Sequence, residues 1–363
     1  VADAVRVRDP QRPVLLISAS EGISYPKPAL STGFAHGKAA SDIADQSAAD
    51  KAAELGIEVR TQTRVIKIDS AKKRITTAKG GIEYGQLVLA LGAKQRVLPL
   101  DGDAADTVLR VNDLATYRKL RERLDAGARH VTLLGAGLIG CEFADDFAGA
   151  GFEVTVVDPA GYPLASLLPT ETGSALRDRL SSRGVHWLFG ASADRIEQSG
   201  DRARVTLSTG AAFETDLVVS AAGLVPNTQL AEKAGLAVGR GIMTDRLMQT
   251  SQPDIFALGD CAAVEGQVFA YIEPIRRQAA TIAAALDGEE VPFDLKPPLV
   301  RVKTPSLPLI VCPPTASERV GAEASTVDGD GRVEYRSGER LVGFVLSGAG
   351  ANHGMQLYRE LYG

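Results

Sequence analysis

The fold of this chain of 363 residues is decided by one stretch, His130-Val-Thr-Leu-Leu-Gly135-Ala-Gly137-Leu-Ile-Gly140. The apolar run 131–134 predicts a buried strand, and the glycines directly after it predict a tight turn. Residues 138–147 predict the helix that follows, and 152–157 predict a second strand that leads into Asp158. Together these segments predict a βαβ unit, which is the building block of a parallel sheet covered by helices.

The three glycines and the aspartate have the spacing of a dinucleotide-binding turn. Gly135 allows the tight turn, Gly137 lets the backbone approach a pyrophosphate, and Gly140 lets helix and strand pack closely. Asp158 is placed to accept hydrogen bonds from the adenosine ribose, and it would repel a 2′-phosphate. No arginine follows it within ten residues, so we predict NADH rather than NADPH. The alternative is a strand–helix turn that binds no ligand.

Composition predicts a folded, soluble protein of two or three domains. Hydrophobic residues make up 45% of the chain and charged residues 23%, and the formal net charge is −5. A negative chain repels nucleic acid and anionic lipid, so neither is an expected partner. The longest uncharged apolar run, 131–140, is about half of the ~20 residues that a membrane helix needs, and we expect neither membrane insertion nor a targeting leader.

The three cysteines Cys141, Cys261 and Cys312 form no CxxC and no close pair. This spacing disfavours a disulfide framework and a zinc site, and it favours a reducing cytoplasm. The four histidines show no metal-ligand spacing either, so no metal is expected. We expect the cysteines to be small buried hydrophobic residues.

Two segments, 57–92 and 185–223, repeat one plan at a shift of 131 positions. The matched residues include Glu83 with Glu214, Val88 with Val219, Ala90 with Ala221, and Gly92 with Gly223. The repeat predicts two domains of one architecture. A break at Lys296-Pro297-Pro298 then opens a third segment of short alternating strands that ends in a helix. The predicted fold is α/β, with two Rossmann-like, doubly wound, three-layer dinucleotide-binding domains and a small C-terminal α+β domain.

Further motifs resemble a known family. Thr250-Ser-Gln-Pro-Asp-Ile-Phe-Ala-Leu-Gly259-Asp260 and Ala221-Ala-Gly223-Leu-Val-Pro226-Asn227 look like motifs of the FAD-dependent pyridine nucleotide-disulfide oxidoreductases. Segments 24–32 and 302–309 resemble the bacterial rubredoxin-NAD(+) reductase branch, which has no redox disulfide. The resemblance covers almost the whole chain and implies FAD and NADH as cofactors.

The resemblance implies a set of FAD contacts. Ser18 and Ala19 match contacts to the adenosine end, Val65 matches one to the adenine, and Ile272 matches one near the flavin ring. Asp260 matches the acceptor of the ribitol hydroxyls, although an aspartate at this step also serves as a helix cap. Ser18 stands where the family often has an acidic residue, so the ribose contact differs from the family pattern.

Three charged residues match positions close to the flavin ring. Lys27, between two prolines, and Lys303, in an apolar strand, would stabilise the anionic reduced flavin. Glu142 matches a glutamate near the flavin and nicotinamide rings that pairs with the lysine at position 27. We therefore assign catalytic roles to Lys27 and Glu142. Without the resemblance, both lysines would be read as surface residues, and Glu142 as a favourable charge near a helix N-terminus.

These assignments predict hydride transfer from NADH to FAD, followed by single-electron transfer to rubredoxin. Residues 24–32 contain no cysteine, so the electrons would leave the flavin directly for a one-electron iron protein. One alternative is a ferredoxin of an oxygenase system as acceptor, and another is a non-enzymatic NADH-binding redox sensor or scaffold. The link of the family with alkane hydroxylation suggests alkane degradation as the pathway.

The predicted domains are an FAD domain (1–111 with 226–295), an NAD domain (112–225) and the C-terminal domain (296–363). The first glycine loop of the family precedes the strand predicted over 14–17, and the chain as given starts after it. We expect a strand–turn–helix start ahead of Val1, because the sheet would otherwise contain buried unpaired strand edges.

Overall fold

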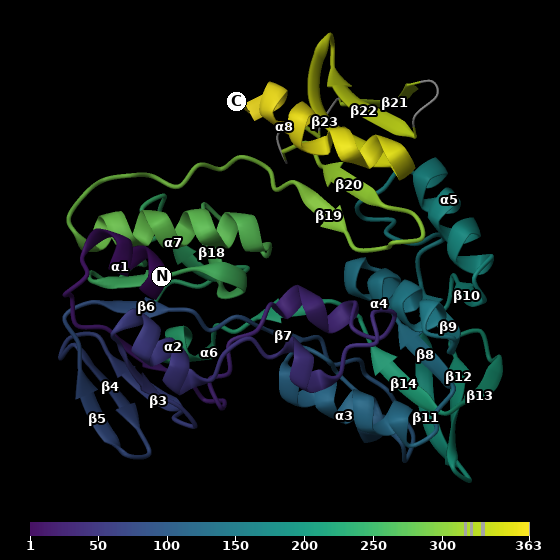
Figure 1. Ribbon diagram of the computed structural model, residues 1–363, viewed down its shortest axis with the longest axis horizontal. Helices are drawn as coiled ribbons and strands as arrows, with labels where there is room; N and C mark the ends of the chain where they lie inside the picture. Colours follow the sequence, from purple (N-terminus) through teal and green to yellow (C-terminus); the bar gives the residue numbers. More distant parts are fainter. Residues whose placement is uncertain (316–317, 320–321, 328–330, 363) are drawn as a thin grey trace. The chain divides into compact units, whose positions relative to one another are not determined.

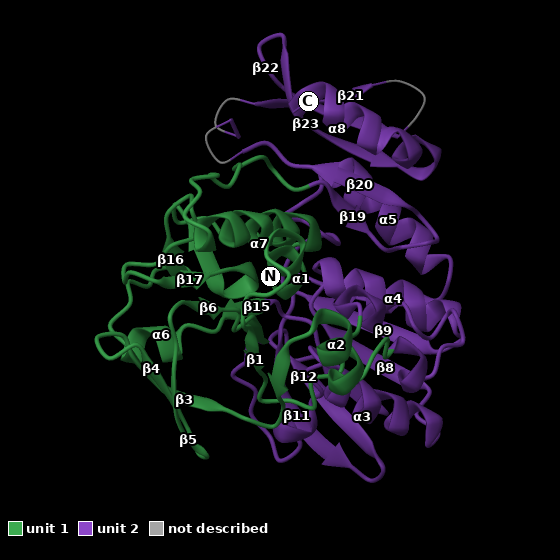
Figure 2. Ribbon diagram, turned by 60° about the vertical axis from the view of Figure 1, so that its left-hand side comes forward, with its two compact units in different colours: residues 1–25, 44–94, 224–298 green, residues 26–43, 95–223, 299–363 purple. Residues whose placement is uncertain are grey.

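The computed structural model describes residues 1–315, 318–319, 322–327 and 331–362 (Figure 1). They form two compact units (Figure 2). Unit 1 comprises Val1–Tyr25, Ala44–Lys94 and Leu224–Pro298, and unit 2 comprises Pro26–Ile43, Gln95–Gly223 and Leu299–Gly363.

Unit 2 is built around a four-stranded parallel sheet in the order β10-β9-β8-β14. Its elements are α3 (Leu114–Asp125), β8 (His130–Leu134), α4 (Leu138–Gly149), β9 (Glu153–Asp158), α5 (Thr170–Ser181), β10 (Val185–Phe189) and β14 (Leu217–Ser220). Every residue of β8 and β14 is buried, which explains why most of their residues are apolar. The predicted βαβ unit over 130–158 is thus confirmed.

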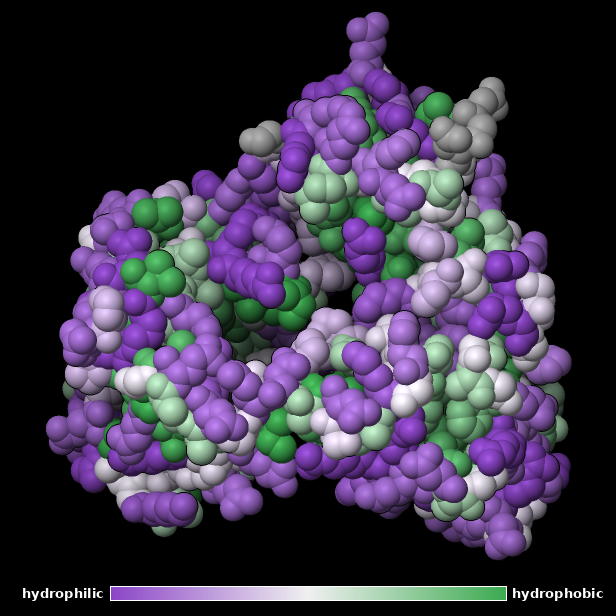
Figure 3. Space-filling view, in the orientation of Figure 1, coloured by the Kyte–Doolittle hydropathy of each residue, from purple (hydrophilic) through white to green (hydrophobic). Residues whose placement is uncertain are grey.

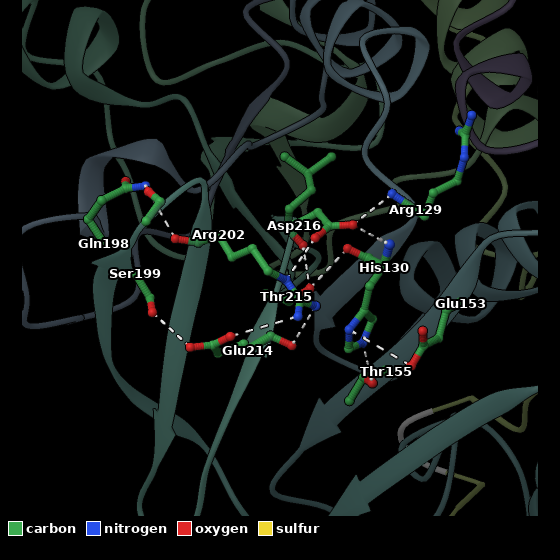
Figure 4. A network of polar contacts seen from close by, with 12 residues as sticks. Arg129, His130, Glu153, Thr155, Gln198, Ser199, Arg202, Glu214, Thr215 and Asp216 are labelled. Atoms are coloured by element: carbon green, nitrogen blue, oxygen red, sulfur yellow. Dashed lines mark hydrogen bonds and ion pairs between the residues drawn. The ribbon is translucent and has the colours of Figure 1, made fainter.

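An antiparallel sheet, β11-β12-β13, joins the parallel sheet through a polar network (Figure 4). Its strands are β11 (Ala193–Ser199), β12 (Arg202–Leu207) and β13 (Ala212–Thr215). Asp216 accepts hydrogen bonds from the backbone N–H groups of Arg129 (2.8 Å) and His130 (2.9 Å), and from Arg202 Nε (2.9 Å). His130 begins β8, and Gly135 follows the end of this strand. The polar network therefore lies at the N-terminal end of β8, and the glycine turn lies at its C-terminal end.

Unit 1 repeats the same supersecondary plan. Its elements are α1 (Ala2–Arg8), β1 (Leu15–Ile17), α2 (Ala48–Leu55), β2 (Glu58–Arg60), β3 (Val65–Asp69), β4 (Arg74–Thr77), β5 (Gly80–Glu83), β6 (Leu87–Leu89), α6 (Gln229–Lys233), β16 (Ile242–Thr244), β17 (Ile255–Ala257), η4 (Gly259–Cys261), β18 (Ala262–Val264) and α7 (Ile272–Leu286). Strand β1 pairs in parallel with β2, and β6 with β17. The antiparallel sheet β3-β4-β5 has the strand order of β11-β12-β13, as the internal repeat predicts.

Helix α7 begins seven residues earlier than the helix predicted over 279–286. Its first turn contains Pro274, whose missing N–H costs nothing there because first-turn amides have no partner within the helix. The proline therefore marks the start of a longer helix.

The C-terminal part of unit 2 is a five-stranded antiparallel sheet in the order β19-β20-β23-β22-β21. Its elements are β19 (Val300–Val302), β20 (Leu309–Cys312), β21 (Glu323–Val327), β22 (Arg332–Ser337), β23 (Arg340–Ser347), η5 (Gly348–His353) and α8 (Gly354–Tyr362). The predicted strands and closing helix are confirmed. Strand β21 was missed because all five of its residues are exposed, so it shows no alternation of apolar and polar residues.

The compact units divide the chain differently from the predicted domains, since 26–43 and 95–111 belong to unit 2. Segment 26–43 contains η1 (Lys27–Ser31) and η2 (Ala40–Ile43). Its Phe34 ring contacts the rings of Tyr117 in α3 and Phe147 in α4, with centroids 5.7 and 5.1 Å apart. Aromatic packing therefore fastens this segment to the helices of unit 2.

Candidate functional site

The glycine turn after β8 has the geometry that a dinucleotide requires. Gly135 has φ +117°, and a Cβ there would lie 2.6 Å from the carbonyl oxygen of Ala221. A Cβ at Gly140 would overlap the carbonyl oxygen of Gly135. A Cβ at Gly137 would meet no atom within 4 Å, so the space in front of this residue fits a pyrophosphate. No side chain of the described residues caps the start of α4, which leaves its first amides to a phosphate.

Asp158 ends β9 beside this turn. Its Oδ2 accepts the backbone N–H of Ala136 at 2.6 Å, and its Oδ1 accepts that of Ala160 at 2.7 Å. These bonds fix the half-buried carboxylate and leave further lone pairs on both oxygens. The residues therefore fit the ribose of an NADH molecule bound at the turn, as the sequence predicts.

Helix α4 also carries a buried ionic cluster, formed by Glu142, Ser31 and Lys303 and called the Glu142 cluster below. Glu142 is 1% exposed, and its Oε2 lies 2.6 Å from Lys303 Nζ and accepts a hydrogen bond from Ser31 Oγ at 2.6 Å. Its Oε1 accepts the backbone N–H of Lys303 at 3.1 Å. The sequence predicts Lys27 as the partner of Glu142, and the ion pair described for Glu142 is with Lys303. Lys27 is exposed and begins η1, the element that ends at Ser31.

Two more buried acids of α4 were missed from the sequence. Asp145 accepts the backbone N–H of Ser306 at 2.9 Å and lies 3.3 Å from Arg183 Nε. Asp146 accepts the backbone N–H groups of Phe34 (3.0 Å) and Ala35 (2.8 Å), and burial raises the pKa of its carboxyl group. The available signal was the spacing of three acids at i, i+3 and i+4 on an otherwise apolar helix.

The other predicted FAD residues lie in unit 1. Ser18 and Ala19 follow β1, and Val65 begins β3. The Ser18 carbonyl accepts the N–H of Thr63 at 2.8 Å. Ile272 begins α7, whose first turn has no side-chain cap among the described residues. The twelve predicted residues are thus divided between the units, with Lys27, Glu142, Lys303 and the NADH residues in unit 2.

Asp260 lies in η4, directly after Gly259, whose φ is +74°. The Gly259 N–H donates to Gln278 Oε1 at 2.8 Å, and Gln278 is fully buried. Its Nε2 has no hydrogen-bond partner among the described residues. A buried donor beside a Gly-Asp step fits a ligand rich in oxygen acceptors, such as the ribityl diphosphate part of FAD.

The three cysteines are free and buried. Burial raises the pKa of each thiol, to about 12 for Cys312, so all three are protonated at neutral pH. Among the residues described, no group of histidine, cysteine and acidic side chains is suited to a metal ion.

Membrane-spanning helices were sought among the described residues, and none is both long and apolar enough. Figure 3 shows apolar side chains interspersed with polar ones over the visible face.

Fold and site define a dinucleotide-dependent oxidoreductase with two domains of one architecture. Residues 1–287 match the family described as pyridine nucleotide-disulphide oxidoreductase, and residues 292–361 match the rubredoxin binding C-terminal domain. The chain belongs to the pyridine nucleotide-disulphide oxidoreductase family. The predicted family and fold class are confirmed.

Curated relatives cover nearly the whole chain. The chain is 40% identical to the rubredoxin-NAD(+) reductase of Alcanivorax borkumensis, over 98% of this chain and 94% of the relative. It is also 40% identical to the nitric oxide reductase FlRd-NAD(+) reductase of Aeromonas salmonicida, over 99% of this chain and 92% of the relative.

Two solved reductases superpose on nearly the whole of this chain. The ferredoxin reductase of the CYP199A2 system from Rhodopseudomonas palustris superposes with a TM-score of 0.88 at 29% identity, over 99% of this chain and 91% of that one. The putidaredoxin reductase in its covalent complex with putidaredoxin gives a TM-score of 0.87 at 26% identity, over 99% and 88% of the chains.

Proposed function

We propose that the protein is an FAD-dependent reductase that oxidises NADH and delivers the electrons singly to rubredoxin. The observation that carries this proposal is the match of residues 292–361 to the rubredoxin binding domain, directly after the dinucleotide-binding part of the chain. Bound FAD would supply the chemistry that links a two-electron donor to a one-electron acceptor. Relatives of similar length that are named rubredoxin-NAD(+) reductase support it.

Each part of the site has a task in this reaction. The turn from Gly135 to Gly140 and the start of α4 hold the NADH pyrophosphate, and Asp158 holds the adenosine ribose. Asp260 would accept hydrogen bonds from the ribitol of FAD, and Lys27 and Glu142 would contribute to the electrostatic environment of its ring. The remaining FAD contacts are those of Ser18, Ala19, Val65 and Ile272.

The acceptor is tested with three purified iron proteins. We expect the full-length protein, supplied with NADH under anaerobic conditions, to reduce rubredoxin at least tenfold faster than a [2Fe–2S] ferredoxin. Faster reduction of the ferredoxin would favour the acceptor type named for the solved reductases. Faster reduction of FlRd would favour the role named for the second group of relatives.

We also propose a cytoplasmic location, which the three protonated, unpaired thiols support. Full activity of the protein as isolated from the periplasmic fraction, with none in the cytoplasmic fraction, would contradict it.

A further inference from the structure

A short turn of the C-terminal sheet lies against helices of the βαβ part of unit 2. Strand β19 ends at Val302 and β20 begins at Leu309, and both strands lie beside α5 (Figure 2). Between them, Thr304 Oγ1 donates to the carbonyl oxygen of Leu307 at 2.8 Å, and the Leu307 N–H donates to the carbonyl oxygen of Thr304 at 3.1 Å. Pro305 lies within this turn and fixes its own φ. The turn 304–307 therefore keeps its shape, and holding one of its residues holds all of it.

Ser306 is held through both polar groups of its backbone. Its N–H donates to Asp145 Oδ2 at 2.9 Å, and its carbonyl oxygen accepts from Arg179 Nε at 2.9 Å. Asp145 belongs to α4 and Arg179 to α5, so two helices bind the same residue from two sides. Ser306, Asp145 and Arg179 are called the Ser306 anchor below.

The carboxylate of the anchor is buried and has a fixed orientation. Asp145 is 3% exposed, and its Oδ1 lies 3.3 Å from Arg183 Nε while Oδ2 accepts the Ser306 N–H. With one donor at each oxygen, the carboxylate group cannot rotate without losing a contact. Because this side chain is shielded from water, removing it would leave the Ser306 N–H without an equivalent acceptor.

A second contact between the C-terminal sheet and α5 is exposed. Thr326 Oγ1 in β21 donates to Glu171 Oε2 in the first turn of α5 at 2.8 Å. Water competes with an exposed hydrogen bond of this kind, so it contributes little to holding the sheet. We therefore expect the placement of the sheet to depend more on Asp145 than on Glu171.

We propose that Asp145 and Arg179 are positioning residues for the electron acceptor, because they hold Ser306 and so keep the C-terminal sheet in the placement on α4 and α5 that rubredoxin recognises. The sheet lies in the part of the chain that matches the rubredoxin binding domain, and the proposal rests on the function proposed above. Without the anchor, the sheet would adopt this placement for only a fraction of the time. The apparent affinity for rubredoxin falls by that fraction, whereas electron transfer in the complex, once formed, is unchanged.

Steady-state kinetics with saturating NADH and rubredoxin as the acceptor, under anaerobic conditions, test the proposal. Asp145→Ala should raise KM for rubredoxin about tenfold and change kcat less than twofold. Asp145→Asn, which keeps an acceptor oxygen for the Ser306 N–H, should restore most of the loss. Arg179→Gln should raise this KM at least threefold. The matched control is Arg177→Gln, which removes an arginine of the same helix that pairs with Asp178 and should leave KM unchanged.

Ferricyanide separates docking from flavin chemistry, because this small acceptor needs no protein docking surface. Its reduction by Asp145→Ala should stay within twofold of wild type. An equal loss of activity with both acceptors would overturn the proposal, because Asp145 would then act on the flavin or on the fraction of folded enzyme. An unchanged KM for rubredoxin, with or without a lower kcat, would overturn it too.

Hydrogen–deuterium exchange tests the anchor without flavin or acceptor. The amides of Ser306 and Leu307 should exchange at least tenfold faster in Asp145→Ala than in wild type, and at the wild-type rate in Arg177→Gln. Unchanged exchange in Asp145→Ala would contradict the anchor. If Asp145→Ala does not fold, Arg179→Gln supplies both readouts, and wild-type exchange and KM there would overturn the proposal. A wild-type protein that does not reduce rubredoxin would defeat the proposed function, while the exchange rates would still show whether Asp145 fixes the turn.

Discussion

Asp158 has two tasks at the residue scale. Its carboxylate is fixed by the backbone N–H groups of Ala136 and Ala160. In the function proposed above, the same oxygens would also accept hydrogen bonds from the ribose of NADH. A substitution here therefore changes both the local turn and the nucleotide contact.

Asp158→Ala should weaken NADH binding about 10- to 100-fold, which corresponds to the loss of charge-assisted hydrogen bonds worth about 1.5–3 kcal/mol. FAD content should stay unchanged, because no predicted FAD residue depends on this carboxylate. Anaerobic titration of flavin reduction measures the change, and Asp158→Asn, which keeps one acceptor oxygen, should lose less. An equal loss of both cofactors would show that the NADH site is misassigned.

Lys27 lies on the exposed start of η1, four residues before the Glu142 cluster. Lys27→Met should slow flavin reduction by NADH about tenfold or more, because a positive charge near the ring favours the anionic reduced flavin. Stopped-flow absorbance measures the rate, with Lys38→Met as the control on the same segment. Unchanged kinetics would make Lys27 an ordinary surface lysine.

At the residue scale, the sequence reveals motifs whose residues lie close together in the chain. Gly135, Gly137, Gly140 and Asp158 were predicted because their roles depend on neighbours within one βαβ unit. The bonds of Ser31 and Lys303 to Glu142 join residues 111 and 161 positions apart, so their pairing required the fold.

At the scale of elements, we expect two glycines of one turn to have different effects, one on NADH binding and the other on stability. Gly137→Ala should leave stability unchanged and weaken NADH binding strongly, because its Cβ would occupy only the space in front of the turn. Gly140→Ala should lower the free energy of unfolding by about 1–3 kcal/mol, because its Cβ would overlap the Gly135 carbonyl. Denaturant titration and NADH titration separate the two effects. Equal effects on stability would contradict the geometry.

The junction of the two sheets of unit 2 should be sensitive to pH. Burial lowers the pKa of His130, whose Nε2 lies 2.8 Å from Thr155 Oγ1 (Figure 4). The unfolded chain therefore binds a proton at a higher pH than the folded chain does. Stability contributed by neutral His130 is complete above the usual histidine pKa of about 6.5 and is lost as pH falls below it.

The charged groups that face His130 are Glu153, Arg202, Asp216 and His186. The pKa of Asp216 is lowered, so its own contribution is lost only in a more acidic range, below its usual value. Urea unfolding between pH 8 and pH 5.5 should show a decline in stability that His130→Gln reduces. His353→Gln, an exposed residue of η5 that is not among the groups facing His130, is the control and should keep the decline. A pH-independent stability would contradict this account.

At the scale of the whole molecule, the sequence predicted the duplicated architecture better than it predicted how the chain is divided into compact units. The shift of 131 positions revealed the duplication because both copies retain their strand pattern, and β3-β4-β5 matches β11-β12-β13. The assignment of 26–43 to unit 2 was missed because it depends on tertiary contacts such as Phe34 with Phe147.

The central claim is that one chain passes electrons from NADH to bound FAD. The most direct test is the visible absorption spectrum of the purified full-length protein before and after anaerobic addition of NADH, and separately of NADPH. We predict a flavin spectrum that NADH bleaches rapidly and NADPH bleaches slowly or not at all. A colourless protein that still binds NADH would contradict the reductase function and leave an NADH-binding sensor or scaffold in its place.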